Sequence, residues 1–297
     1  MGSARFGKVL TAMVTPFAPD GSLDAEGAAA VAQWLVDHGS DGLVLAGTTG
    51  EAPTLDDNEK LALWRTVRAA VDVPLLAGAG SNDTRHSIEL SRQAVETGVD
   101  GLLIVTPYYN RPPQAGIEAH FRAVAEATEL PIVLYDVPIR TARQIDPGML
   151  IRLAREVPTI VGLKDAAGDP GSTARVIAEA GDDFDVYSGD TALTLPLLTV
   201  GAVGVIGVST HWSGDLHAEM IAAFDKGDLA TARHINARLA PSFAVESGPT
   251  WVQTSAAKAA LAELDVHDGP LRMPLPPISD EARAAVREVL EGLGVAS

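Results

Sequence analysis

The sequence contains no cysteine, only five lysines and no long uninterrupted apolar run. The absence of cysteine excludes disulfides and thiolate chemistry, and it fits a reducing compartment. A membrane-spanning helix needs a run of about 18 apolar residues, so none is expected. Residues 1–17 also lack the apolar core of a signal peptide. We therefore expect a soluble, cytoplasmic protein without a membrane partner.

The 297 residues are 46% hydrophobic and 21% charged, which is typical of a globular protein rather than a disordered one. The formal net charge is −17. So acidic a chain is a poor partner for a nucleic-acid backbone or an anionic membrane surface, because like charges repel. Small anionic substrates remain open, since a binding site can be locally positive within an acidic protein.

Eight short apolar runs recur along the first two thirds of the chain. They are VLTAMVTP, GLVLAG, PLLAGAG, GLLIVTP, PIVLYDVP, TIVGLKDA, FDVYSGD and GAVGVIGVS. Continuous runs of this kind favour strands covered on both faces, as in parallel sheets. Segments with helical periodicity lie between them, such as residues 24–39, with Asp24 as N-cap and Gly39 as C-cap, and residues 84–98.

Eight alternations of strand and helix predict an α/β fold, the (β/α)8 TIM barrel. A doubly wound open sheet is the alternative, but its usual phosphate loop has only AGAGSND as a candidate, which lacks the third glycine. Beyond residue 226 the strand pattern stops and helical segments follow. We therefore predict a catalytic barrel over residues 1–226 and a C-terminal helical appendage over residues 227–297. Residues 269–279 are interpreted as a linker before the last helix.

Chemistry in such a barrel is expected at the C-terminal ends of the strands. Three of the apolar runs are followed by polar residues, in GTTGE, TPYYNRP and YDVPIRT. A fourth run, TIVGL, is followed directly by Lys164. Burial lowers the pKa of a lysine, and a neutral amine can form a Schiff base with a carbonyl compound. Tyrosine and threonine hydroxyls can transfer protons, and Arg140 can bind a carboxylate. This set predicts a class I aldolase that acts on keto acids.

Each of these residues also has a purely structural interpretation. Lys164 could be a surface or ion-paired residue at a strand end, and Arg140 a solvated surface charge. GTTGE could be a turn with Thr48 or Thr49 as a helix cap, and TPYYN could be packing plus a turn. The placement of all four features at successive strand ends favours the catalytic interpretation.

The seven histidines are scattered, without an HxH or HExxH pair. With no cysteine either, a zinc-dependent aldolase has no evident ligand set, so we expect no metal. The histidines are best interpreted as ordinary helix or loop residues. Only His211, with Trp212, follows the eighth apolar run closely enough to reach the rim of a site.

Six motifs, in the order GTTGE, TPYYNRP, LYDVPIRT, GLKDAAGD, YSGD and GVIGV, closely resemble those of the dihydrodipicolinate synthase family. The wider group contains N-acetylneuraminate lyase and related pyruvate aldolases. The resemblance covers nearly the whole chain. It implies that pyruvate condenses with aspartate 4-semialdehyde to give 4-hydroxy-tetrahydrodipicolinate, on the route to diaminopimelate and lysine. No metal or cofactor is implied beyond a covalent pyruvate imine.

The resemblance also implies roles for single residues. Lys164 would form the imine with pyruvate, and Tyr135 would act as general acid and base over it. Thr48 and Tyr109 would complete a proton relay, with Tyr109 reaching into the site of a neighbouring subunit. The implied assembly is a homo-oligomer, a tetramer built as a dimer of dimers.

Four further residues would bind the substrates. Thr49 would hold the pyruvate carboxylate through its backbone N–H and hydroxyl, and Arg140 would hold the carboxylate of aspartate 4-semialdehyde. Gly189 and Ile206 match backbone positions that line the site. Arg140 and the second tyrosine of YYN favour the synthase over the sialic-acid lyase, which typically carries GSTGE in place of GTTGE.

Some positions depart from the family pattern. Ala142 follows RT where glycine is frequent, and SGPTWVQTSAAK stands where an NP-x-P-x-K sequence is usual. Members inhibited by lysine use histidines and a glutamate at places that match Asp57, Lys60 and His86, although Asn82 and Tyr108 are kept. Without the glutamate, and with Lys60 repelling the ligand's ammonium group, we predict weak or absent inhibition by lysine.

Two rival functions stay open. The chain could be another pyruvate-dependent class I aldolase acting on a different 2-keto acid, of the N-acetylneuraminate or 2-keto-3-deoxy sugar acid type. It could also be a non-catalytic homologue that binds a keto acid. The joint presence of Lys164, Tyr135, Thr48 and Tyr109 argues against the second, because binding alone needs no proton relay.

Overall fold

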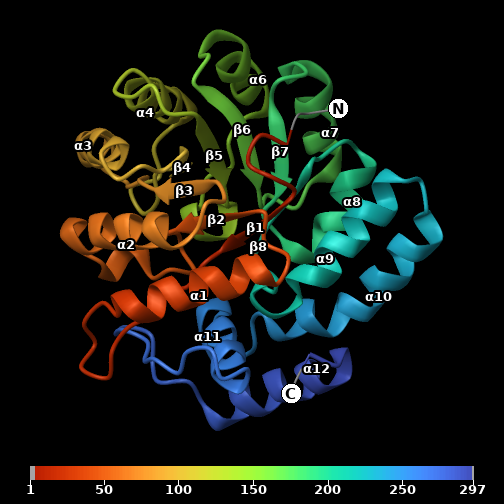
Figure 1. Cartoon of the computed structure of the whole chain (residues 1–297). Helices are drawn as coiled ribbons and strands as arrows, with labels where there is room; N and C mark the ends of the chain where they lie inside the picture. Colours follow the sequence, from red (N-terminus) through yellow and green to blue (C-terminus); the bar gives the residue numbers. More distant parts are fainter. Residues whose placement is uncertain (1–3, 296–297) are drawn as a thin grey trace. The chain divides into compact units, whose positions relative to one another are not determined.

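The structure, a computed structural model, describes residues 4–295, and its strands follow one another around a closed barrel (Figure 1). The strands are β1 (Val9–Ala12), β2 (Gly42–Leu45), β3 (Leu75–Gly78), β4 (Gly101–Val105), β5 (Ile132–Asp136), β6 (Ile160–Asp165), β7 (Asp185–Ser188) and β8 (Gly204–Gly207). Sequence neighbours pair in parallel, as in β5 with β6 and β6 with β7. The predicted (β/α)8 barrel is confirmed, and the open doubly wound sheet is excluded.

Helices alternate with the strands and then continue alone. They are α1 (Ala25–Asp37), α2 (Asp57–Ala70), α3 (Thr84–Val95), α4 (Gln114–Ala125), α5 (Pro138–Thr141), α6 (Pro147–Glu156), α7 (Pro170–Ala180), α8 (Thr194–Thr199), α9 (Thr210–Asp225), α10 (Leu229–Val245), α11 (Gln253–Glu263) and α12 (Asp280–Leu293), with short 3-10 turns η1 (Ala52–Thr54) and η2 (Thr191–Leu193). Up to residue 295, no strand follows β8, which confirms the helical C-terminal appendage. None of the described helices is long and apolar enough to cross a membrane.

The chain forms two compact units. The first comprises Pro74–Ile206 together with the N-terminal residues up to Lys8, so it carries β3 to β7 and most of β8. The second comprises Val9–Val73 together with the chain from Gly207 onward, so it carries β1, β2 and the C-terminal helices. The functional boundary at residue 226, drawn where the strand pattern stops, stays a prediction.

In the second unit, α1 begins where the sequence predicts. The Asp24 side chain accepts a hydrogen bond from the Gly27 N–H at 2.9 Å, which is the N-cap interaction. The predicted end is one residue too late, because His38 is the C-cap and Gly39 lies beyond it. Gly39 has φ +91°, and a Cβ there would lie 2.6 Å from the Asp215 backbone nitrogen. Both the conformation and the space require glycine at this turn.

The helix predicted over residues 84–98, in the first unit, also ends early. α3 stops at Val95, with Glu96 as C-cap. Gly98 has φ +80°, so it belongs to the turn that leads into β4. In both helices the glycine marks the reversal of the chain after the helix rather than a residue within it.

α11 is buried on all sides. Eight consecutive residues, 254–261, are buried, and most of them are small. The helix packs against α9 and α12, which lie in the same unit (Figure 1). A helix that is covered all round is a core element rather than a surface one. It nevertheless carries a charged residue, Lys258, whose side chain is 1% exposed.

The first unit pairs β5 with β6 so that Tyr135 lies opposite Lys164, and Asp136 lies opposite Asp165. Successive strand residues point to opposite faces, so the two pairs lie on different faces of the sheet. Asp136 is 2% exposed, and its Oδ2 accepts a hydrogen bond from the Ile145 N–H at 3.2 Å. Burial is the main cause that raises the pKa of Asp136 to about 7; the Ile145 N–H opposes this shift, and the nearby Asp165 carboxylate adds to it.

This pKa generates a prediction for stability. Between about pH 4 and pH 7 the folded state binds a proton at Asp136 that the unfolded chain has released, so the free energy of unfolding falls as pH rises. Asp136→Asn removes that titration. We expect the free energy of unfolding of the variant, relative to that of the wild type, to rise by about 2.7 kcal/mol between pH 5 and pH 8, because pH 5 lies two units below the folded pKa and each unit contributes about 1.4 kcal/mol. Urea unfolding at the two pH values measures it, with exposed Asp183→Asn as control, and an equal difference at both would contradict the prediction.

Candidate active site

The first unit brings the predicted nucleophile and the predicted acid and base together. Lys164 and Tyr135 are register partners at the ends of β6 and β5, and each is 5% exposed. The Lys164 Nζ lies 4.5 Å from the centroid of the Tyr135 ring. A buried amine against a tyrosine, at the C-terminal ends of two parallel strands, is an arrangement suited to attack on a carbonyl compound. The structure thus excludes the interpretation of Lys164 as a surface residue.

Gly189 leaves room for the stem of that lysine. A Cβ at Gly189 would lie 3.0 Å from the Lys164 Cγ and 3.0 Å from the Ala166 Cβ. Its N–H donates to the Asp165 carbonyl at 2.7 Å, which holds the loop after β7 close to β6. Any side chain at this position would therefore press on the lysine. Ile206, the other predicted lining residue, is fully buried in β8.

Arg140 and Tyr109 lie in the segments that follow two strands, and both are exposed. Arg140 belongs to α5, the single turn of helix that comes directly after β5. Tyr109 comes after β4 and is 91% exposed, with φ +71°. An aromatic ring with this exposure is available for contact with another molecule.

Non-glycine residues with positive φ gather after β4 and β5. They are Tyr109, Arg111 and Ala142, with φ of 71°, 47° and 55°. The left-handed conformation costs a residue with a Cβ about 1–2 kcal/mol, so such strain persists where surroundings impose it, often at functional sites. For Ala142 this explains the family's preference for glycine at the same place, because glycine adopts the conformation without strain.

The second unit contains the GTTGE segment, which we call the threonine loop (residues 47–51). It follows β2, with Thr49 buried and Thr48 half-buried. The Thr15 hydroxyl donates to the Gly50 carbonyl at 2.6 Å, and the Gln253 amide donates to the Thr49 hydroxyl oxygen at 3.4 Å. Neither Thr48 nor Thr49 caps the following turn, since the N-cap of η1 is Glu51, without a side-chain cap. The capping interpretation of the threonines is wrong.

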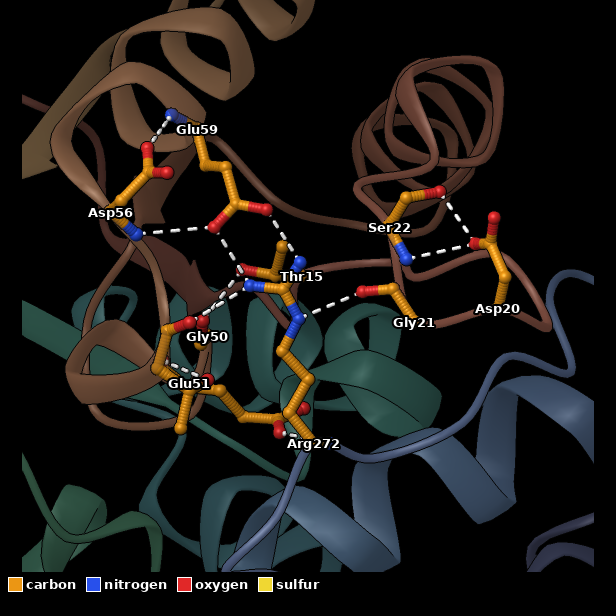
Figure 2. A network of polar contacts seen from close by, with 10 residues as sticks. Thr15, Asp20, Gly21, Ser22, Gly50, Glu51, Asp56, Glu59 and Arg272 are labelled. Atoms are coloured by element: carbon orange, nitrogen blue, oxygen red, sulfur yellow. Dashed lines mark hydrogen bonds and ion pairs between the residues drawn. The ribbon is translucent and has the colours of Figure 1, made fainter.

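A charge network surrounds Glu51, and Figure 2 shows the part of it that contains Arg272 and Glu59. The Lys258 Nζ lies 2.7 Å from the Glu51 Oε1, and both side chains are 1% exposed. The backbone N–H of Arg272 donates to the Glu51 Oε2 at 2.8 Å. The Arg272 guanidinium bonds both carboxylate oxygens of Glu59, near the start of α2. Burial lowers the pKa of Lys258 while the adjacent Glu51 raises it, so the carboxylate favours the charged amine.

Sequence reasoning missed this network. Residues 269–279 were interpreted as a linker, yet Arg272 in this segment makes backbone and side-chain contacts with the second unit's N-terminal part. A signal for Lys258 was available. It is one of only five lysines, and it stands in the apolar and small run SAAKAAL, so the rule that singled out Lys164 applies to it equally.

Three buried histidines have structural roles, as predicted for the histidines in general. The His211 Nε2 accepts from the Val14 N–H at 3.1 Å, and its Nδ1–H donates to the Val208 carbonyl at 2.7 Å. Burial lowers the pKa of His120, His211 and His217 to about 4, so each is neutral at physiological pH. His211 is thus fully used in bridging two backbone segments. Within the described residues, no three His, Asp or Glu side chains are grouped as metal ligands.

Comparison with known proteins identifies the family. The model of the Dihydrodipicolinate synthetase family matches residues 5–293. A 4-hydroxy-tetrahydrodipicolinate synthase from Acidothermus cellulolyticus is 50% identical over 294 residues, which is 98% of this chain and 94% of that protein. The protein of the same name from Symbiobacterium thermophilum is 50% identical over 295 residues, covering 98% of this chain and 99% of the relative.

Solved structures agree with these sequences. The dihydrodipicolinate synthase from Cyanidioschyzon merolae, determined with lysine bound, is 41% identical, with a TM-score of 0.93 over 98% of this chain and 99% of that one. The enzyme from Bacillus anthracis is 42% identical, with a TM-score of 0.91 over the same shares. The family match spans the strands and the C-terminal helices alike, and it accords with the motifs at the strand ends. This chain therefore belongs to the dihydrodipicolinate synthetase family.

Proposed function

We propose that this chain is a 4-hydroxy-tetrahydrodipicolinate synthase, a lyase that condenses pyruvate with L-aspartate 4-semialdehyde in the biosynthesis of diaminopimelate and lysine. The observation that carries the proposal is Lys164, buried at the end of β6 with its amine against the Tyr135 ring. Schiff-base aldolases need such an amine. Relatives half identical over nearly the whole chain bear the synthase name.

The reaction begins when the neutral Lys164 amine attacks C2 of pyruvate. Loss of water gives an imine, and loss of a methyl proton turns the imine into an enamine. The enamine carbon forms a bond to the aldehyde carbon of the second substrate, whose oxygen takes up a proton and becomes a hydroxyl. The amino group of that substrate then adds to the imine carbon. That addition closes the ring, and expulsion of the Lys164 amine then leaves a cyclic imine and regenerates the enzyme without a cofactor.

Tyr135 is the proposed general acid and base in these steps. It removes the methyl proton and protonates the oxygens that leave or develop negative charge. Its support is the contact with Lys164, which keeps the phenol near the imine nitrogen. Thr48 and Tyr109 are proposed to pass protons between Tyr135 and solvent, as the family resemblance implies.

Tyr109 is proposed to act in the active site of a neighbouring subunit. Its 91% exposure and its left-handed backbone support this role, because the ring projects from the chain that carries it. The minimum catalytic unit is then a dimer, and the proposed assembly is a tetramer built from two such dimers. A relative that is 34% identical has a structure described as that of a monomeric variant.

The substrates are held by four further residues in this proposal. Thr49 binds the pyruvate carboxylate through its N–H and hydroxyl, and Arg140 binds the carboxylate of aspartate 4-semialdehyde. Arg140 is exposed directly after β5, so its guanidinium is accessible to the carboxylate of a substrate. Gly189 and Ile206 line the site, and the close approach of Gly189 to Lys164 supports its part.

A different pyruvate aldolase is the second candidate, and it differs only in the acceptor aldehyde. A panel that contains aspartate 4-semialdehyde and sugar-derived aldehydes separates the two functions. The non-catalytic alternative lacks the reactive amine and is tested by trapping, as follows.

Borohydride reduction in the presence of pyruvate should trap one pyruvyl group per chain on Lys164, because the imine is reduced to a stable secondary amine. Lys164→Ala should abolish the adduct and lower turnover in the coupled assay with aspartate 4-semialdehyde by several orders of magnitude. Lys226→Ala, which removes an exposed lysine at the end of α9, is the matched control and should behave as wild type. Mass spectrometry of the peptide locates the adduct. An adduct that survives in Lys164→Ala would contradict the assignment.

Complementation tests the role of Tyr109 across subunits. Tyr109→Phe and Lys164→Ala should each be nearly inactive alone. In a mixed dimer one site receives an intact Lys164 from one chain and an intact Tyr109 from the other, so co-expression should restore about a quarter of wild-type activity for random pairing in a two-fold symmetric dimer. Mixed assemblies as inactive as the parents would show that Tyr109 serves its own chain.

Lysine should inhibit this chain weakly or not at all. The Lys60 ammonium lies 3.8 Å from Asp57 on α2, and burial lowers the pKa of Lys60 while Asp57 opposes that shift. A cation held there repels the ammonium group of free lysine. Initial rates with millimolar lysine should stay within twofold of the uninhibited rate, and Lys60→Gln should be more sensitive than wild type. An inhibition constant in the low micromolar range would overturn this expectation.

A further inference from the structure

We propose that Lys258 and Arg272 are positioning residues for pyruvate binding, which act by fixing Glu51 and with it the threonine loop. These three residues are called the Glu51 clamp. The inference rests on the proposed function, because it assumes that Thr48 and Thr49 act on pyruvate. It adds a role for the C-terminal part of the chain, which holds none of the residues proposed for the chemistry.

Glu51 stands at the corner where the threonine loop turns into η1. Its backbone is left-handed, with φ +55°. A residue with a Cβ avoids that conformation unless its surroundings impose it. Each oxygen of its carboxylate contacts a residue from the C-terminal part of the chain. Oε1 lies 2.7 Å from the Lys258 Nζ, and Oε2 accepts from the backbone N–H of Arg272 at 2.8 Å. Two groups from more than 200 positions along the chain therefore hold the strained corner.

Lys258 is itself fixed by its surroundings. It lies on the buried helix α11, and its Nζ donates to the Pro270 carbonyl at 2.7 Å. The same Nζ lies 4.3 Å from the centroid of the Phe17 ring, and the Arg272 Cζ lies 4.1 Å from the same centroid. Cations over an aromatic face are attracted to it, so Phe17 holds both clamp residues. The lysine thus joins Glu51, the helix and the segment that carries Arg272.

The Arg272 side chain extends the clamp to the other end of the turn (Figure 2). Its guanidinium donates to the Thr54 carbonyl at 2.8 Å and to the Gly21 carbonyl at 2.9 Å. It also pairs with Glu59, whose pKa is lowered mainly by that hydrogen bond. Glu59 closes a capping box with Asp56 at the start of α2. The chain from the threonine loop to α2 is therefore held at Glu51, Thr54 and Glu59 by a single arginine.

The threonines receive their orientation from the same side of the unit. Gln253, on α11 with Lys258, donates its amide to the Thr49 hydroxyl oxygen at 3.4 Å. A hydroxyl that accepts in this way keeps its own proton for another acceptor, such as a carboxylate. The Gly50 carbonyl between Thr49 and Glu51 accepts from Thr15 at 2.6 Å. The loop is thus held at Thr49 and at the two residues that follow it.

Stability alone gives a weak reason for such a network. Taking two charges out of water offsets most of their attraction, and an apolar pair of the same volume is often at least as stable. A paired charge with defined partners instead fixes one geometry. Displacement of a binding group by about 1 Å can lower a rate by about 100-fold. The clamp therefore fits a positioning role for the threonine loop better than a purely stabilising one.

The test separates position from stability. Lys258→Met and Glu51→Gln should each raise the KM for pyruvate at least tenfold, with a smaller change in the KM for aspartate 4-semialdehyde. Each single variant should also lower Tm, Lys258→Met more, because it leaves a buried carboxylate unpaired. The double variant Glu51→Gln/Lys258→Met removes the unpaired charge, so it should recover Tm, whereas its KM for pyruvate should stay raised. Recovery of Tm and KM together would overturn the inference.

Two further variants complete the design. Arg287→Gln breaks the exposed pair of Arg287 with Glu263, at 2.7 Å, in the same C-terminal region but away from the clamp. It should leave the KM for pyruvate unchanged, and an equal rise there would overturn the inference. Thr49→Val tests the proposed function separately. If Thr49→Val raises the KM for pyruvate while the clamp variants do not, the positioning role of the clamp is contradicted. If Thr49→Val has no effect on this KM, the proposed role of Thr49 is contradicted, and the clamp variants alone decide the role of the clamp.

Discussion

The whole structure depends on one constraint: nearly every residue of the barrel strands is buried, so polar groups can emerge only where the strands end. β1, β2, β3 and β5 are buried at each position. A parallel sheet covered on both faces leaves no other place for reactive side chains that must meet water-soluble substrates. Lys164 and Tyr135 stand at the ends of their strands for this reason, and the threonine loop begins where β2 stops.

The same constraint makes the two buried lysines informative. Burial of an ammonium group is unfavourable, and the fold resolves it in two ways. Lys258 is matched to a carboxylate, a carbonyl and an aromatic ring, so its charge is used to fix geometry. Lys164 stands over the Tyr135 ring at a strand end, where substrates can reach its amine. One rule of burial thus yields a structural cation and a proposed nucleophile.

Much of the barrel could be predicted from the sequence because its signals are local. Apolar runs predict the strands, and Asp24 predicts the start of α1 because its own side chain makes the N-cap hydrogen bond. Helix ends were less accurate, because a glycine such as Gly39 marks the turn after the helix as readily as its last residue. Residues 269–279 connect α11 to α12 without a helix or strand, as predicted, but the contacts of this segment were not predicted. Nothing near Arg272 in the sequence reveals Glu51 or Glu59, more than 200 positions away, and only the fold brings them together.

That long-range contact gives the C-terminal helices a structural role, which is to support the threonine loop. A (β/α)8 barrel presents its site through loops, and loops are the least rigid part of a fold. The threonine loop is short and contains a residue in a strained conformation, so it needs support from outside the barrel. α11 can supply it because its small residues allow complete burial, which places Lys258 at a fixed depth. Two residues of this helix, Gln253 and Lys258, thus contact the loop at Thr49 and at Glu51, and a helix remote in sequence sets the geometry of a strand end.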